Sequence, residues 1–127
     1  MATILVIDDE GIITRALQKL LEKEGYHVII ALSGQEAIER CKGVDFDLII
    51  SDIRMPQLDG IETVKKIRQL LQGRGKKPVP EIIITGYADE SSYKNALQLK
   101  VADYLYKPFD IKEFMATIKR NLDAAQG

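Results

Sequence analysis

Short apolar runs recur along the chain, and each is followed by a stretch whose apolar residues have helical spacing. The expected strands are Ile4–Ile7, Tyr26–Ala31, Asp47–Ser51, Glu81–Thr85 and Tyr104–Tyr106. The first four contain near-continuous apolar runs, which are typical of a parallel sheet that helices cover on both faces. The sequence therefore predicts an α/β fold with a five-stranded, doubly wound parallel sheet, although alternation alone leaves the strand order open.

Helices are expected after each strand, where apolar residues recur three and four positions apart. The third should begin at Gly60, where the Asp59-Gly60 pair is interpreted as a turn that admits a positive φ. The fourth has the thinnest apolar face, which predicts that it is the most mobile. The expected helix caps are Asp9, Ser33, either Asp89 or Ser91, and Asp110 with Glu113 as a capping box.

Composition excludes several classes of protein. The 127 residues suit one domain, and a net charge of -1 argues against a nucleic-acid surface or a polybasic membrane anchor. No apolar run approaches the roughly 20 residues of a membrane span. Cys41 is the lone cysteine, which excludes an intrachain disulfide and a cysteine zinc cluster. We expect a cytoplasmic protein that is one domain over residues 1–127, with no output domain in this chain.

Polar residues follow four of the expected strands. Asp8 and Asp9 follow the first strand, Asp52 follows the third, Thr85 ends the fourth and Lys107 lies just beyond the fifth. Because the carboxyl ends of parallel strands meet at one edge of a sheet, these side chains should lie together. Each one alone has an ordinary structural explanation, so the joint arrangement carries the functional hypothesis.

Three carboxylates at one edge require a cation or a proton. Two like charges about 4 Å apart repel by roughly 4 kcal/mol at an effective dielectric of 20. The set offers oxygen ligands without histidine or cysteine, which predicts Mg²⁺. A carboxylate beside Mg²⁺ and a lysine, with a hydroxyl at hand, is equipped to attack phosphorus and hold the transferred group.

Together these motifs resemble the receiver domain of bacterial two-component response regulators, the CheY-like family. The match rests on the Asp-Asp pair, on Asp52 with Met-Pro and Asp-Gly behind it, on Thr85 and on Lys107-Pro108. It covers nearly the whole chain. The resemblance implies a flavodoxin-like (βα)5 three-layer sandwich, and a cis peptide between Lys107 and Pro108.

The resemblance also implies a role for each site residue. Asp52 would be the phosphoacceptor, while Thr85 and Lys107 would contact the phosphoryl group. Thr85 would also act in switching, together with Tyr104, which matches the family's switch aromatic. The implied Mg²⁺ ligands are Asp8, Asp9, Asp52 and the backbone carbonyl of Arg54.

Partners follow from the same resemblance. The phosphoryl donor would be a sensor histidine kinase or phosphotransfer protein, because His27 is the single histidine and is expected far from Asp52. Phosphorylation adds nearly two negative charges and would reshape the surface of the fourth helix, fifth strand and fifth helix. A downstream effector, or a second copy in a homodimer, would bind there. The domain would act only on its own phosphorylation state, so it is not expected to be an enzyme.

Three alternatives compete with this interpretation. A flavin-binding protein holds phosphate in a hydroxyl- and amide-rich loop after the first strand, where this chain has Asp-Asp-Glu. A haloacid-dehalogenase-like phosphatase needs a second aspartate two residues after the nucleophile, where Arg54 stands. A degenerate receiver that only binds a partner stays the alternative function, although the full residue set argues against it.

Two features of the sequence distinguish this chain from common members of the family. Residues 72–80 are expected to form a flexible, basic loop that is a few residues longer than in common members of the family. Arg54 and Tyr87 lie two residues after Asp52 and Thr85, at positions that tune how water reaches the phosphoryl group in the family.

Overall fold

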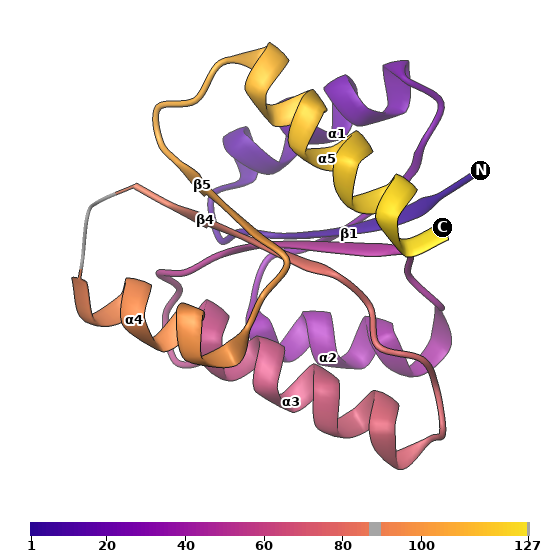
Figure 1. Ribbon diagram of the computed structural model, residues 1–127, viewed down its shortest axis with the longest axis vertical. Helices are drawn as coiled ribbons and strands as arrows, with labels where there is room; N and C mark the ends of the chain where they lie inside the picture. The colour runs from indigo at the N-terminus through magenta and orange to yellow at the C-terminus, as the bar shows by residue number, and fades with distance from the viewer. Residues whose placement is uncertain (87–89, 127) are drawn as a thin grey trace.

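The computed structural model describes residues 1–86 and 90–126, with the backbone alone at residues 90–93 and 125–126. Within these ranges five strands alternate with five helices (Figure 1). The strands are β1 (Thr3–Ile7), β2 (His27–Ala31), β3 (Leu48–Asp52), β4 (Glu81–Thr85) and β5 (Asp103–Tyr106). The helices are α1 (Gly11–Lys23), α2 (Gly34–Gly43), α3 (Gly60–Gly73), α4 (Glu90–Leu99) and α5 (Ile111–Gln126). The expected alternation is confirmed, with strand ends displaced by about one residue.

The strands form one parallel sheet in the order β2-β1-β3-β4-β5. This is the flavodoxin-like order, in which the direction of winding reverses between β1 and β3. Helices α1 and α5 cover one face of the sheet, and α2, α3 and α4 cover the other (Figure 1). The doubly wound three-layer sandwich is therefore confirmed.

The core lies on both sides of the sheet because successive strand residues point to opposite faces. Ile4 of β1 packs with Phe114 of α5 on one side. Leu5 packs with Ile67 of α3 and Cys41 of α2 on the other. All residues of β3 and β4 are buried, which explains why their sequences lack polar alternation.

Two of the expected helix caps are confirmed. Ser33 Oγ accepts a hydrogen bond from the Glu36 backbone N–H at 3.0 Å at the start of α2. Asp110 Oδ1 accepts one from the Glu113 N–H at 2.6 Å before α5. The expected caps of α4, Asp89 and Ser91, lie outside the described residues and side chains, as does Tyr87. The mobility of α4 stays a prediction.

The expected cap of α1 by Asp9 is wrong. The N-cap residue is Glu10, and its side chain makes no capping hydrogen bond. The Glu10 backbone N–H instead donates to Asp8 Oδ1 at 2.9 Å. The carboxylate of Asp9 lies close to those of Asp8 and Asp52, so its position serves that cluster rather than the helix.

Gly60 is required for a reason other than the predicted positive φ. It is the first residue of α3, behind the N-cap Asp59, and the left-handed conformation in this turn falls on Gln57, whose φ is 68°. A Cβ on Gly60 would lie 2.3 Å from the Asp52 carbonyl oxygen and 2.9 Å from the Ile53 Cα. Glycine lets α3 begin directly against the end of β3.

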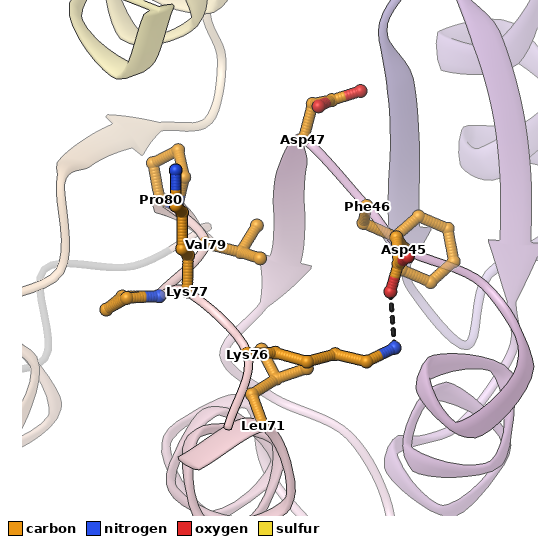
Figure 2. A pocket seen from close by; sticks show the side chains of 9 residues that line it. Asp45, Phe46, Asp47, Leu71, Lys76, Lys77, Val79 and Pro80 are labelled. Carbon is orange, nitrogen blue, oxygen red and sulfur yellow. Dashed lines mark hydrogen bonds and ion pairs between the residues drawn. The ribbon is translucent and has the colours of Figure 1, made fainter. Parts of the chain in front are cut away.

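The basic loop after α3 lies at the amino ends of the strands and contacts the end of α2 and the segment that follows it. Arg74 Nη1 donates to the Lys42 carbonyl at 2.9 Å, and Lys76 forms an ion pair with Asp45. The Lys76–Asp45 contact, drawn in Figure 2, borders a hollow with a volume of about 350 Å³. Lys76 and Lys77 are both exposed, so the Lys76–Asp45 pair lies at the surface.

Candidate functional site

The candidate site lies where the carboxyl ends of β1 and β3 meet. Asp8 directly follows β1, and Asp52 is the last residue of β3. Pairing of Ile7 with Ser51 in the parallel register brings these two aspartates side by side. This position is the topological switch point of the sheet, where open α/β folds present a crevice.

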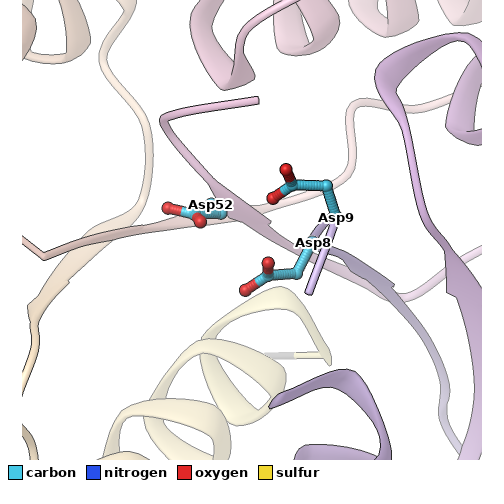
Figure 3. Close-up of side chains that lie close together, drawn as sticks. All are labelled: Asp8, Asp9 and Asp52. Atoms are coloured by element: carbon cyan, nitrogen blue, oxygen red, sulfur yellow. The ribbon is translucent and has the colours of Figure 1, made fainter. Parts of the chain in front are cut away.

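Three carboxylates gather there, as predicted. One oxygen of each of Asp8, Asp9 and Asp52 lies within 4.8 Å of the others (Figure 3). Asp8 is 3% and Asp52 is 7% exposed, whereas Asp9 is exposed. Two buried carboxylates and one open to solvent form a set of oxygen ligands that suits a hard divalent cation.

Lys107 supplies a positive charge to the two buried carboxylates. Its Nζ lies 3.6 Å from Asp52 Oδ2 and 3.8 Å from Asp8 Oδ2. The Lys107 backbone N–H donates to the Thr85 carbonyl at 2.8 Å, which fixes the end of β5 against β4. The Lys107-Pro108 peptide bond is cis, as predicted. One ammonium against three carboxylates leaves the cluster negative.

Burial shifts the protonation of this cluster. Burial, together with the nearby charge of Asp52, raises the pKa of Asp8 to about 6, although the Glu10 N–H and Lys107 oppose this shift. Burial also raises the pKa of Asp52, while Lys107 and the N–H groups of Arg54 and Ile53 oppose that shift. Two groups with raised pKa values beside one another are typical of functional sites, where a charge partner completes the set.

An open cleft of about 510 Å³ gives access to the cluster. Its lining residues are Asp9, Glu10, Ile13, Asp52, Arg54, Gly86, Lys107 and Pro108. The sequence did not predict that Glu10 and Ile13 line this cleft, because only their position shortly after the Asp-Asp pair indicates it. A small phosphorylated group, or a side chain of a partner, can reach Asp52 through this opening.

The other predicted residues divide into two groups. Thr85 is buried at the end of β4, on the same sheet edge as the acidic cluster, and Arg54 is exposed on the cleft wall. Tyr104 lies one strand further along, paired in register with Ile83, and packs against the cluster that contains Ala96 of α4. The structure therefore places Thr85 at the same sheet edge as the acidic cluster and Tyr104 beside α4.

His27 lies at the amino ends of the strands, away from the acidic cluster. It is the first residue of β2 and is exposed.

None of the helices in the described ranges is long and apolar enough to cross a membrane.

Comparison with known proteins agrees with this geometry. A family model for the response regulator receiver domain matches residues 4–119. The transcriptional regulatory protein ZraR of Escherichia coli K12 is 38% identical over 94% of this chain and 26% of its own length. The alkaline phosphatase synthesis transcriptional regulatory protein PhoP of Bacillus subtilis is 40% identical over 91% of this chain and 46% of its own. The chain thus spans less than half the length of these two relatives.

Solved structures show the same architecture over whole chains. A CheY-like receiver domain protein from Methanospirillum hungatei has a TM-score of 0.90 and 29% identity, covering 99% of this chain and 97% of its own. The chemotaxis protein CheY4 of Vibrio cholerae has a TM-score of 0.85 and 30% identity, covering 94% and 98%. With the family model matched across almost all of the sheet and its helices, this chain belongs to the response regulator receiver domain family.

Proposed function

We propose that the domain, over residues 1–127, accepts a phosphoryl group on Asp52. The observation that carries this proposal is the position of Lys107 Nζ, within 4 Å of the carboxylates of both Asp52 and Asp8. An ammonium there can stabilise negative charge that develops on a phosphoryl group as it approaches Asp52. The open cleft beside Asp52 supports access by a donor.

The donor set fits Mg²⁺. Asp8, Asp9 and Asp52 would hold the ion, with the backbone carbonyl of Arg54 as a further ligand. Their excess negative charge, which Lys107 compensates only in part, supports this assignment. When bound, Mg²⁺ would neutralise the carboxylates and accept phosphoryl oxygens.

The transfer itself uses Asp52 as the nucleophile. A carboxylate oxygen of Asp52 forms a bond to phosphorus while the bond from phosphorus to the leaving group breaks, and the leaving group keeps that electron pair: acetate departs as the anion, and an imidazole takes up a proton from water. Lys107 contacts the phosphoryl oxygens, and Thr85 donates its hydroxyl to one of them. Hydrolysis of the acyl phosphate then returns the Asp52 carboxylate and inorganic phosphate. The domain changes only its own state, so it is a signalling module.

The donor in this proposal is the phosphohistidine of a sensor kinase or a phosphotransfer protein in the cytoplasm. The exposed His27, at the far end of β2, is poorly placed to serve Asp52. Phosphorylation would draw Thr85 towards the phosphoryl group and let Tyr104 turn inward, which changes the α4-β5-α5 surface. A downstream effector or a second copy of the domain would bind the changed surface. Packing of Tyr104 against the Ala96 cluster supports this coupling.

Intact mass spectrometry tests the proposal. The wild-type chain should gain one phosphoryl group on incubation with Mg²⁺ and acetyl phosphate, and peptide mapping should locate it at Asp52. Asp52→Asn should gain none. Asp47→Asn is the matched control, because Asp47 is an exposed carboxylate just before β3, at the amino end. Absence of any gain in the wild type at every donor concentration would favour the alternative, a degenerate receiver that binds partners without phosphorylation.

Acid should weaken Mg²⁺ binding. Because burial raises the pKa of Asp8 to about 6, a proton competes with the cation below that pH. We expect the Kd for Mg²⁺ from isothermal titration calorimetry to be about tenfold weaker at pH 5 than at pH 7 through Asp8 alone. A Kd that does not change across this range would contradict the assignment of Asp8 as a ligand.

Acid should have the opposite effect on the stability of the metal-free domain, because protonation of Asp8 stabilises the folded state. A folded-state pKa above the ordinary value of 3.8 means that the folded chain binds the proton more tightly. This contribution is present below pH 3.8 and is lost as the pH rises through about 6. Because Mg²⁺ also binds more weakly when Asp8 is protonated, excess Mg²⁺ should raise Tm more at pH 7 than at pH 5.

A further inference from the structure

Arg68 of α3 joins three elements at the edge of the sheet opposite the candidate site. Its Nε and Nη2 donate to the two carboxylate oxygens of Glu81 at 2.8 and 2.7 Å. Its Nη1 donates to the carbonyl of Leu99, the last residue of α4. We call these three residues the α4 clamp. It links the middle of α3 to the start of β4 and the end of α4.

The clamp is well suited to hold its position. Glu81 is 5% exposed in a strand that is buried on both faces, so its charge requires a bound partner. A guanidinium is planar and offers five donors in a fixed arrangement. Two of its nitrogens satisfy Glu81, and the third remains directed at Leu99. The carbonyl of Leu99 is one of those that a helix end leaves without an intrahelical partner.

The chain beyond α4 is fixed at the same place. Lys100 adopts a left-handed conformation with φ of 56°, and its N–H donates to the Leu97 carbonyl at 3.0 Å. The Ala102 N–H then donates to the Glu81 carbonyl at 2.9 Å. The Glu81 carbonyl therefore holds the segment just after α4 against β4, and the Glu81 side chain acts on the carboxyl end of α4 through Arg68.

Strand β4 connects this clamp to the candidate site. Glu81 is its first residue and Thr85 its last, so the clamp and the proposed phosphate contact lie at opposite ends of one short strand. Helix α4 follows β4 and runs back to the clamp. Its amino end is therefore the end nearer in sequence to Thr85, and its carboxyl end is the clamped one.

We propose that the α4 clamp makes the carboxyl end of α4 a fixed pivot, so that phosphorylation displaces the amino end of the helix about it. This inference rests on the proposed function for its trigger and on the contacts of Arg68 for its geometry. Arg68 is a positioning residue in this scheme. It does not touch the phosphoryl group, and it determines which part of the α4-β5-α5 surface changes.

Arg74, the C-cap residue directly after α3, provides a matched control. It also donates to the last turn of a neighbouring helix, at the Lys42 carbonyl of α2. Like loss of Arg68, loss of Arg74 removes one positive charge and a hydrogen bond to a helix-end carbonyl, but it changes no contact of α4. Arg68→Met leaves the buried Glu81 without its partner and is expected to reduce stability. The double variant R68M/E81M removes both charges and keeps the fold available for measurement.

The experiment is backbone amide hydrogen exchange, with and without Mg²⁺ and acetyl phosphate, and intact mass recorded on the same samples. Without phosphorylation, exchange in residues 96–101 should be at least about tenfold faster in R68M/E81M than in the wild type. It should be unchanged there in R74M. On phosphorylation, the wild type should change in residues 90–95 but not in residues 96–101, whereas the double variant should change in both.

Each outcome decides one claim. Unaltered exchange of residues 96–101 in R68M/E81M, or an equal increase in R74M, would overturn the clamp. If phosphorylation changed the exchange of residues 96–101 in the wild type as much as that of residues 90–95, the pivot would be overturned. A purely stabilising ion pair does not predict a difference between these two segments. A chain that gains no phosphoryl group contradicts the proposed function, and the comparison of the unphosphorylated variants then decides the clamp alone.

Discussion

Lys107→Met should slow the phosphorylation of Asp52 by acetyl phosphate about 100-fold without weakening Mg²⁺ binding. The ammonium lies 3.6 Å from Asp52 and 3.8 Å from Asp8, where it can stabilise charge on the incoming phosphoryl group. The same charge repels a cation bound by these carboxylates, so its removal should leave the Kd for Mg²⁺ equal or tighter. Phosphorylation is followed by intact mass against time, and Mg²⁺ binding by calorimetry.

Lys119→Met is the matched control, because Lys119 is exposed on α5 and takes no part in the acidic cluster. It should be phosphorylated at the wild-type rate. If Lys107→Met also kept that rate, the role of Lys107 in the transfer would be wrong. If it lost phosphorylation and Mg²⁺ binding together, Lys107 would instead be holding the carboxylates in place.

Gly60→Ala should destabilise the domain by about 2–3 kcal/mol, although alanine is usually the better residue in a helix. Its Cβ would lie 2.3 Å from the Asp52 carbonyl oxygen, so α3 must move away from the end of β3 or distort it. Thermal unfolding should show a Tm lower by roughly 6–12 °C. Because Asp52 is the residue displaced, phosphorylation should also be slower in the fraction that remains folded.

Gly11→Ala is the control for this substitution. Gly11 is also the first residue of a helix, and a Cβ there would meet nothing within 4 Å. It should leave Tm unchanged or raise it slightly, through reduced entropy of the unfolded chain. Equal Tm values for the Gly60 and Gly11 variants would show that α3 can shift without cost.

The sequence predicts the parts of this domain that depend on pattern. Apolar runs at Ile4–Ile7 and Ile82–Ile84 are legible as buried parallel strands because no polar residue interrupts them. Placement of Asp8, Asp52 and Lys107 on one edge follows from parallel strands alone, and the distances between their side chains confirm it. Strand order came only from the family resemblance, because alternation is compatible with several orders.

The parts that the sequence did not predict depend on contacts between distant segments. Gly60 was interpreted as a turn glycine, since nothing nearby in the sequence signals the approach of the Asp52 carbonyl. Asp9 carries a good capping side chain, but its place beside Asp8 and Asp52 depends on the pairing of strands that are distant in the sequence. The pairing of Arg68 with Glu81 joins residues whose local sequences suggest only a surface charge and a strand start.

The pairing of β1 with β3 has a consequence for folding kinetics. Asp8 and Asp52 are distant in the sequence and meet only when Ile7 pairs with Ser51, so their mutual repulsion first arises as the central strands join. An unfolded or half-assembled chain contains no such cluster and cannot chelate a cation in the same way. A divalent ion bound by all three carboxylates would therefore select the fully paired sheet and slow its opening, so the proposed metal site would also stabilise the centre of the fold.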